Sequence, residues 1–274
     1  MGELLPPESA IPEKLHAAMR YSCLAPGKRL RPALAMACAE AVGGSELSVI
    51  DAGCAIEFVH CFSLIHDDLP SIDNDDLRRG FPTCHVKFGE AVAILAGDAL
   101  FALAFNTLAR GPWTDDQRVR AILSLTVATG SEGLVGGETI DILSEGQPIE
   151  SQTLETIHVR KTAALIAASC EIGAVLAGAT KEQSNRLFQY GQAIGLAFQI
   201  ADDILNETST PEQLGKAAGS DRERGKATYP ALFGLDVSRQ MALEKAQFGI
   251  DCLSEFPNRD FLESIAQYSV ERLH

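Results

Sequence analysis

The sequence lacks several features that mark common classes of protein. The 274 residues carry a net charge of −14, so we expect no groove for nucleic acid. None of the seven cysteines forms a C-x-x-C pair, which argues against zinc and disulfides and predicts buried reduced thiols in a cytoplasmic protein. The N-terminus has no basic segment followed by an apolar run, and no stretch is apolar for long enough, so we expect neither a signal peptide nor a membrane span.

Alternation of apolar and polar residues, the pattern of strands, is also scarce. Ala, Leu and Glu are abundant, and apolar residues recur at helical spacing, which favours helices. We expect helices over 13–25, 28–42, 48 into the acidic segment, 90–110, 115–144, 151–178, 181–207 and, as two or three shorter ones, 228–274. Because no linker or repeat interrupts the chain, we predict one all-α domain over 1–274.

A segment with many aspartates, HDDLPSIDNDDLRRG, covers residues 66–80. Its acids are Asp67, Asp68, Asp73, Asp75 and Asp76. Such crowded like charges repel one another, so the segment is either a solvated turn or a site for a hard cation such as Mg²⁺. Asp67 and Asp73 lie about 120° apart on an ideal helix. We therefore expect Pro70 to kink the helix and bring them together.

A second acidic cluster, ADDILNE, lies at the end of the helix predicted over 181–207. Asp202 and Asn206 are one turn apart, with Asp203 beside them. Acids at a helix C-terminus oppose the helix dipole, which suggests that a cation binds there.

Basic residues recur at the ends of predicted elements beside these acids. They are Lys28, Arg29, Arg31, Arg78, Arg79, Arg160, Lys161, Lys216, Arg222, Arg224 and Lys226. Arg and Lys bind phosphate, so two acidic walls, cations and an apolar interior together describe a site for diphosphates with apolar tails.

The chain resembles the trans-isoprenyl diphosphate synthases along nearly its whole length. The motifs that carry the resemblance are GKRLRP (27–32), HCFSLIHDDLPSIDNDDLRRG (60–80), GEAVAILAGDAL (89–100), RKTAAL (160–165), FQIADDILN (198–206), LGK (214–216) and GKATYP (225–230). The resemblance implies a helical bundle around a deep apolar cavity, a homodimer, and Mg²⁺-dependent condensation of isopentenyl diphosphate with allylic diphosphates, head to tail.

The resemblance also implies roles for single residues. The residues that would hold Mg²⁺ are Asp67, Asp68, Asp73 and, across the cavity, Asp202 with its neighbour Asp203. The residues that would contact the allylic diphosphate are Arg78, Lys161, Lys216 and Lys226. The residues that would hold isopentenyl diphosphate are Lys28, Arg31, His60 and Arg79. Thr162 and Gln199 would stabilise the allylic cation with their oxygens. Asp75 and Asp76 have no assigned role.

The sequence departs from the family pattern at three positions. Asn206 stands where the family has Asp, Pro26 replaces a Gly, and Glu138 stands where the family usually has Gln. Product length depends on the residues just before the first motif. The aromatic Phe62, with the small Ser63 beside it, would form the floor of the pocket and predicts farnesyl diphosphate (C15). The alternative is geranylgeranyl diphosphate (C20), which the stretch HAAMRYSCLAPGKRLRP favours.

Three other functions are compatible with parts of the sequence. Two E-x-x-H patterns, Glu57 with His60 and Glu155 with His158, match those of di-iron carboxylate bundles. That reading leaves the Asp clusters unexplained. A terpene cyclase shares the first acidic motif but has no need for GKRLRP. A non-catalytic partner subunit typically loses the first aspartates, and here they are present.

Overall fold

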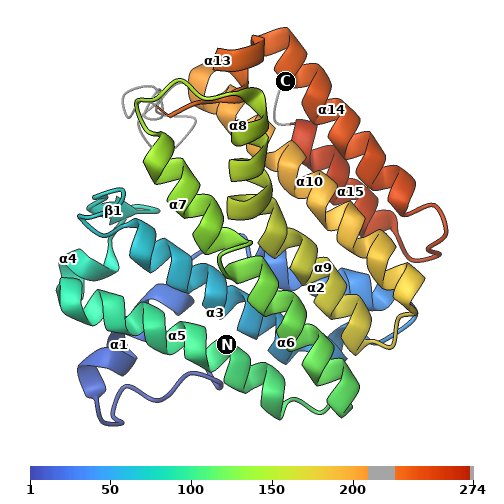
Figure 1. Ribbon diagram of the computed structural model, residues 1–274. Helices are drawn as coiled ribbons and strands as arrows, with labels where there is room; N and C mark the ends of the chain where they lie inside the picture. Colours follow the sequence, from blue (N-terminus) through green and yellow to red (C-terminus); the bar gives the residue numbers. More distant parts are fainter. Residues whose placement is uncertain (209–225, 272–274) are drawn as a thin grey trace.

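Helices make up almost all of the regular structure. The computed structural model describes residues 1–208 and 226–271 (Figure 1). The first half contains α1 (Glu13–Leu24), α2 (Leu30–Ala41), a 3-10 turn (Glu46–Val49), α3 (Ile50–Asp67), a hairpin of β1 (Leu77–Arg78) and β2 (Phe81–Pro82), α4 (Cys84–Phe88) and α5 (Glu90–Arg110). The second half contains α6 (Asp115–Thr129), α7 (Leu134–Ser144), α8 (Ser151–His158), a π turn (Val159–Ala163), α9 (Ala164–Leu176), α10 (Lys181–Thr208), α13 (Tyr229–Phe233), α14 (Leu235–Cys252) and α15 (Asp260–Glu271). The all-α prediction is confirmed; the short antiparallel hairpin was not foreseen.

The helix predicted over 115–144 is in fact two helices, α6 and α7. The chain leaves the helix at Gly130 and turns back at Gly133, whose N–H donates to the carbonyl of Gly130 at 3.0 Å. A Cβ on Gly133 would lie 2.1 Å from the carbonyl oxygen of Ala128, so only glycine fits this turn. The prediction over 151–178 misses a smaller feature, because the π turn interrupts the helical run between α8 and α9.

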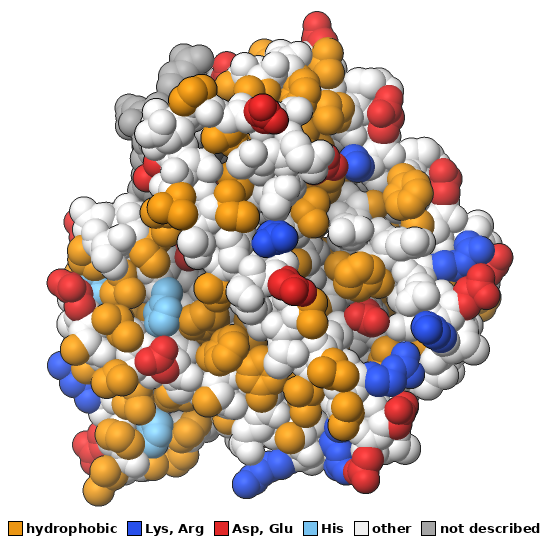
Figure 2. All heavy atoms as spheres, viewed as in Figure 1, with side chains coloured by type: hydrophobic (Ala, Val, Ile, Leu, Met, Phe, Trp, Pro, Cys, Tyr) orange, Lys and Arg blue, Asp and Glu red, His pale blue; other side chains and the backbone are white. Residues whose placement is uncertain are grey.

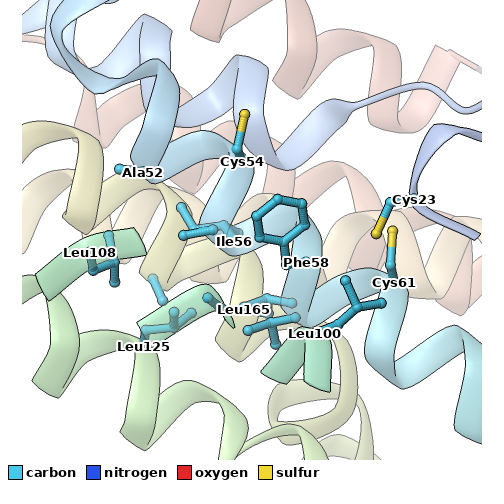
Figure 3. Close-up of a cluster of buried hydrophobic side chains, with 14 of the residues drawn as sticks. Cys23, Ala52, Cys54, Ile56, Phe58, Cys61, Leu100, Leu108, Leu125 and Leu165 are labelled. Atoms are coloured by element: carbon cyan, nitrogen blue, oxygen red, sulfur yellow. The ribbon is translucent and has the colours of Figure 1, made fainter. Parts of the chain in front are cut away.

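Helix α3 lies in the middle of one hydrophobic cluster. It packs along α5 and α2, and most of its length is buried. Figure 3 shows Ile56 and Phe58 of α3 beside Leu100 of α5 and Leu165 of α9. Burial on nearly every side fixes the direction in which α3 delivers its C-terminal aspartates.

Two helical segments are long and apolar enough, by length and composition, to cross a membrane. They are Glu46–Asp67 and Glu90–Arg110. The expectation that no stretch of the chain meets this criterion is therefore corrected. Core helices pass the same test, and 67% of the first window is buried within the fold.

The π turn lies between α7 on one side and α10 on the other. Helix α10 also packs along α9 and α14 (Figure 1). Residues from α7, the π turn and α10 therefore meet in one place, close to the segment that follows α3.

Candidate active site

The first acidic segment is organised by the end of α3, and no kink is involved. Helix α3 ends at Asp67, and the chain then turns back so that the N–H of Asp73 donates to the carbonyl of Asp67 at 2.8 Å. The N–H of Asn74 closes the same turn on Leu69 at 3.0 Å. The prediction that Pro70 would kink a continuing helix is wrong, because the helix stops before it. The expected consequence, Asp73 beside Asp67, is nevertheless met.

Asp67 lies in a strongly acidic environment. Burial, with the nearby charges of Glu138 and Asp73, raises the pKa of Asp67 to about 7 against the opposing effect of Lys161. One carboxylate oxygen of Glu138, Oε1, is buried and has no hydrogen-bond partner. A divalent cation would stabilise this group of buried carboxylates, because it would neutralise their mutual repulsion and give the free oxygen of Glu138 a partner.

Two predicted lysines meet on this acidic wall. Lys161 Nζ lies 2.7 Å from Glu138 Oε2 and 2.6 Å from Asp141 Oδ2. Lys226 Nζ lies 3.4 Å from the same Asp141 oxygen and 3.6 Å from Asp73 Oδ1. Burial by itself would lower the pKa of Lys161, but Asp141 and Glu138 raise it overall, so this lysine stays charged. The site therefore holds ammonium groups ready to meet an anion.

The π turn explains why Lys161 and its neighbour Thr162 serve the same site. A π turn inserts one residue into a helix and changes which side chains share a face, and such turns are frequent at functional sites. Thr162 Oγ1 donates to Gln199 Oε1 of α10 at 2.9 Å. The structure thus joins Thr162 to Gln199, two of the three residues predicted to be catalytic, while the third, Lys161, contacts Glu138 and Asp141.

The neighbours Asp202 and Asp203 have different surroundings. Asp202 is exposed, whereas Asp203 is buried, with 3% of its surface accessible. Both oxygens of Asp203 accept hydrogen bonds within the fold, one from Gln199 and the other from the N–H of Tyr229. The prediction that Asp203 ligates Mg²⁺ therefore does not fit its geometry. Asn206, one turn further, is buried as well.

Asp68 also differs from its neighbour Asp67. Its Oδ1 accepts from Arg78 Nε at 2.8 Å and lies 2.6 Å from Arg78 Nη2. Burial raises the pKa of Asp68 in spite of the Arg78 guanidinium, which lowers it. Asp68 thus binds Arg78 and stands apart from the lysine cluster, a placement different from the shared metal set predicted.

Two of the residues predicted to hold isopentenyl diphosphate, His60 and Arg79, line one pocket. This pocket, of about 580 Å³, opens between α1, α3, the hairpin and α4, and Arg78 also lines it. Arg31 has a buried Nε without a hydrogen-bond partner, which fits a site that awaits an anion. Lys28 lies apart, with Nζ 5.8 Å from the ring centroid of Tyr268.

His60 is poised as a neutral side chain. Burial and the nearby guanidinium groups of Arg31 and Arg79 hold the pKa of His60 well below its usual range. A neutral imidazole still donates one hydrogen bond to a phosphate oxygen. Lys216 lies outside the described residues.

The residues predicted to set product length form part of an aromatic row. The ring centroid of Phe62 lies 5.1 Å from that of Phe101 on α5, which lies 5.0 Å from that of Phe105. Ser63 is buried and donates to the carbonyl of His60 at 3.0 Å. Phe62 is therefore one member of a three-ring wall.

Sequence reasoning missed Asp141 and Glu145, and it treated Glu138 only as a departure. Glu145 Oε1 lies 3.8 Å from Lys226 Nζ. Asp141 lies three residues after Glu138, so the two share a face of α7, and that spacing was the available signal. Asp75 and Asp76 accept hydrogen bonds from Thr83 through their backbone carbonyls, which ties the acidic segment to the start of α4.

The E-x-x-H residues do not assemble a metal centre in the described chain. Glu57 forms an ion pair with Arg29 at 2.6 Å, and His158 contacts Asp203. Within 1–208 and 226–271, no group of three or more His, Cys, Asp or Glu side chains is gathered closely enough to hold a metal ion by itself. The geometry thus gives no support to a di-iron bundle.

Residues 12–251 match the polyprenyl synthetase family. The chain belongs to this family. The large subunit 1 of the heterodimeric geranylgeranyl pyrophosphate synthase, chloroplastic, of Arabidopsis thaliana is 50% identical over 238 residues, which are 84% of this chain and 64% of that protein. The geranylgeranyl pyrophosphate synthase, chloroplastic, of Catharanthus roseus is 46% identical over 264 residues, 95% of this chain and 71% of that protein.

A solved polyprenyl synthetase has the same fold. The apo crystal structure of an FPP/GFPP synthase from Zymomonas mobilis matches with a TM-score of 0.87 and 39% identity, covering 98% of this chain and 92% of that one. The chain spans less than two thirds of the length of the Arabidopsis relative. The resemblance to the isoprenyl diphosphate synthases is thereby confirmed.

Proposed function

We propose that the chain is a Mg²⁺-dependent prenyltransferase that joins isopentenyl diphosphate, head to tail, to allylic diphosphates. One observation carries the proposal: the ammonium groups of Lys161 and Lys226 share Asp141 of α7, and Lys226 also lies 3.6 Å from Asp73 in the segment after α3. The next residue in the chain after Lys161 is Thr162, which bonds to Gln199. Anion-binding groups, cation-binding groups and neutral oxygens in one place are what this reaction needs. Membership of the polyprenyl synthetase family supports the same reaction.

The lysines would bind the allylic diphosphate in exchange for the carboxylates that hold them now. Lys161 is shared between Glu138 and Asp141, and Asp141 also lies 3.4 Å from Lys226, so Asp141 would keep a cationic partner when Lys161 turns to an incoming diphosphate. Lys216, by resemblance, and Arg78, held by Asp68, would complete the contacts. Asp67, Asp73 and Asp202 would hold Mg²⁺, which neutralises the charge of the diphosphate as it leaves.

The allylic cation left after loss of diphosphate would face oxygen atoms. Gln199 Oε1 and Thr162 Oγ1 lie 2.9 Å apart and together present partial negative charge without a nucleophile. The surrounding apolar helices would keep water from the cation. Isopentenyl diphosphate would bind at Lys28, Arg31, His60 and Arg79, where the orphaned Nε of Arg31 would gain a phosphate partner.

We further propose geranylgeranyl diphosphate (C20) as the main product, in place of the farnesyl diphosphate (C15) favoured from sequence. Both curated relatives described above are named for the C20 product. The row of Phe62, Phe101 and Phe105 would form the end wall of the tail pocket.

Product analysis tests this function. The purified chain is supplied with Mg²⁺, isopentenyl diphosphate and, separately, dimethylallyl, geranyl or farnesyl diphosphate. We expect farnesyl diphosphate to be extended to C20 and no further. Accumulation of C15 would overturn the C20 assignment. Turnover of an allylic diphosphate without isopentenyl diphosphate would indicate a terpene cyclase, and no turnover at all would favour a non-catalytic partner subunit.

The chain would act as a homodimer built on the exposed apolar face of α5, α6 and α7. Large hydrophobic residues exposed on this face are Ile94, Leu95, Val119, Leu123, Val127, Val135, Ile142 and Leu143. Figure 2 shows hydrophobic side chains gathered on this side of the molecule. A cytoplasmic location stays a prediction, since both curated relatives are named chloroplastic.

A further inference from the structure

Asp203 joins three elements through contacts that involve no ligand. Its Oδ1 accepts from Gln199 Nε2 of α10 at 3.1 Å. Its Oδ2 lies 3.1 Å from His158 Nε2 at the end of α8 and accepts from the N–H of Tyr229 of α13 at 3.0 Å. The His158 ring stacks on that of Tyr229, with centroids 5.4 Å apart and planes 17° from parallel. The carboxylate is thus held from three directions.

The chemistry of these groups fixes which way the Gln199 amide points. An ionised carboxylate only accepts hydrogen bonds, so the group of Gln199 that faces Asp203 must be the NH₂. The amide oxygen is then directed to the other side, where Thr162 Oγ1 donates to it. Reversal of the amide would set oxygen against carboxylate and NH₂ against the hydroxyl, and would lose the Asp203 contact.

His158 and the Tyr229 N–H hold the carboxylate itself in place. Since Asp203 cannot donate, the contact between Asp203 and His158 requires the imidazole to carry hydrogen on Nε2. His158 and Asp203 are 7% and 3% exposed, so water competes little for these bonds. The network therefore runs from Tyr229 and His158 through Asp203 to Gln199 and ends at Thr162.

We propose that Asp203 is a positioning residue for the prenyl transfer, with His158 as its support, and that it orients the Gln199 oxygen toward the allylic cation. This inference rests on the proposed function. It gives the adjacent aspartates separate tasks. The exposed Asp202 would bind Mg²⁺, and the buried Asp203 would orient the Gln199 amide, which contacts the substrate. Loss of Asp203 should then slow the chemical step and leave substrate and metal binding intact.

The first experiment compares Asp203→Asn with wild type and with Gln192→Ala, a change at an exposed position of the same helix. In the variant, the Asn NH₂ faces either the Tyr229 N–H, donor against donor, or Gln199, whose amide must then reverse and turn its oxygen away from Thr162. We expect kcat to fall between 10- and 100-fold, or about 1.4 to 2.7 kcal/mol, while both KM values and the half-saturating Mg²⁺ concentration change less than twofold. A metal ligand would instead show a rise of tenfold or more in the Mg²⁺ requirement, and that result would overturn the proposal, as would an unchanged kcat.

The second experiment keeps the proposal testable if Asp203→Asn does not fold. His158→Gln retains a side-chain N–H that can reach Asp203, whereas His158→Leu does not. We expect the Gln variant to keep kcat within about threefold of wild type and the Leu variant to lose about tenfold, with equal KM values. Equal kcat in the two variants would overturn the role of His158.

A separate measurement distinguishes failure of the proposed prenyltransferase function from failure of the positioning role of Asp203. Calorimetric binding of an allylic diphosphate with Mg²⁺ to the wild-type chain, together with product formation, tests the prenyltransferase alone. Active wild type with an unaffected Asp203→Asn variant would overturn only the positioning role.

Discussion

Glu138 uses one carboxylate oxygen to bind Lys161 and leaves the other buried without a hydrogen-bond partner. Its charge is one of the causes that raise the pKa of Asp67. We predict that Glu138→Gln, which restores the usual residue of the family, weakens divalent-ion binding about fivefold, or about 1 kcal/mol, because one negative charge near Asp67 is lost. The free-ion EPR signal of Mn²⁺ during titration measures this. Glu132→Gln, at an exposed position before α7, should leave binding unchanged; equal affinities in both variants would contradict the prediction.

Phe62 is the residue on which product length is expected to depend. Its ring packs edge to face against Phe101, so truncation removes one of three rings in the proposed wall. We predict that Phe62→Ala shifts the product distribution to chains at least one C5 unit longer, as measured by chromatography of the dephosphorylated products. Phe248→Ala, on the exposed side of α14, serves as the control. If the distribution is the same in both variants, the floor of the pocket lies elsewhere.

At the scale of elements, the contact between α7 and the π turn positions Lys161. A Cβ on Gly137 would lie 2.3 Å from the backbone nitrogen of Lys161 and 2.8 Å from its Cα, and the backbone of the turn cannot easily yield. We predict that Gly137→Ala lowers kcat at least tenfold and destabilises the fold by roughly 1–3 kcal/mol, since overpacking must push α7 away from the turn. Steady-state kinetics and urea denaturation measure these effects.

Thr139→Ala provides the matched control on the same helix, because Thr139 is exposed and bonds only within α7. It should retain activity and stability. Full activity of Gly137→Ala would show that the lysine does not depend on this close approach.

At the scale of the whole molecule, the apolar face of α5, α6 and α7 is the surface expected to be covered by a second copy. Val127 on α6 is 57% exposed, and Val237 on α14, outside this face, is 50% exposed, so the two make a matched pair. We predict that Val127→Asp converts dimer to monomer, because it places a charge in the apolar centre of the contact. Val237→Asp should remain dimeric. Light scattering after size-exclusion chromatography gives the masses; a monomeric wild type would contradict the prediction.

The dimer contact is also expected to affect catalysis. Helix α5 also carries two of the three rings of the aromatic wall, and α7 carries the carboxylates that hold Lys161. We therefore expect the specific activity of the Val127→Asp variant to follow the fraction of dimer that remains at each protein concentration. Activity independent of concentration would show that each subunit works alone.

The sequence by itself determined the chemistry and the fold class. Helical periodicity predicted an all-α chain, and the acidic clusters around Asp67 and Asp202, with the basic residues near them, predicted a site for diphosphates. The roles of Lys161 and Gln199 came from the family resemblance. These features follow from local composition and motif order. They required no knowledge of which side chains meet across the fold, and the family match agrees with them.

Only the tertiary structure decided how those residues divide the work. Asp68 and Asp203 belong to the same motifs as Asp67 and Asp202, yet one binds Arg78 and the other binds Gln199. Asp141 became visible only because α7 packs on the π turn and brings it 2.6 Å from Lys161. The physical reason is that a side chain's direction depends on where its helix ends and on what packs against it. Neither α3 stopping at Asp67 nor the position of α7 is recorded in the spacing of a motif.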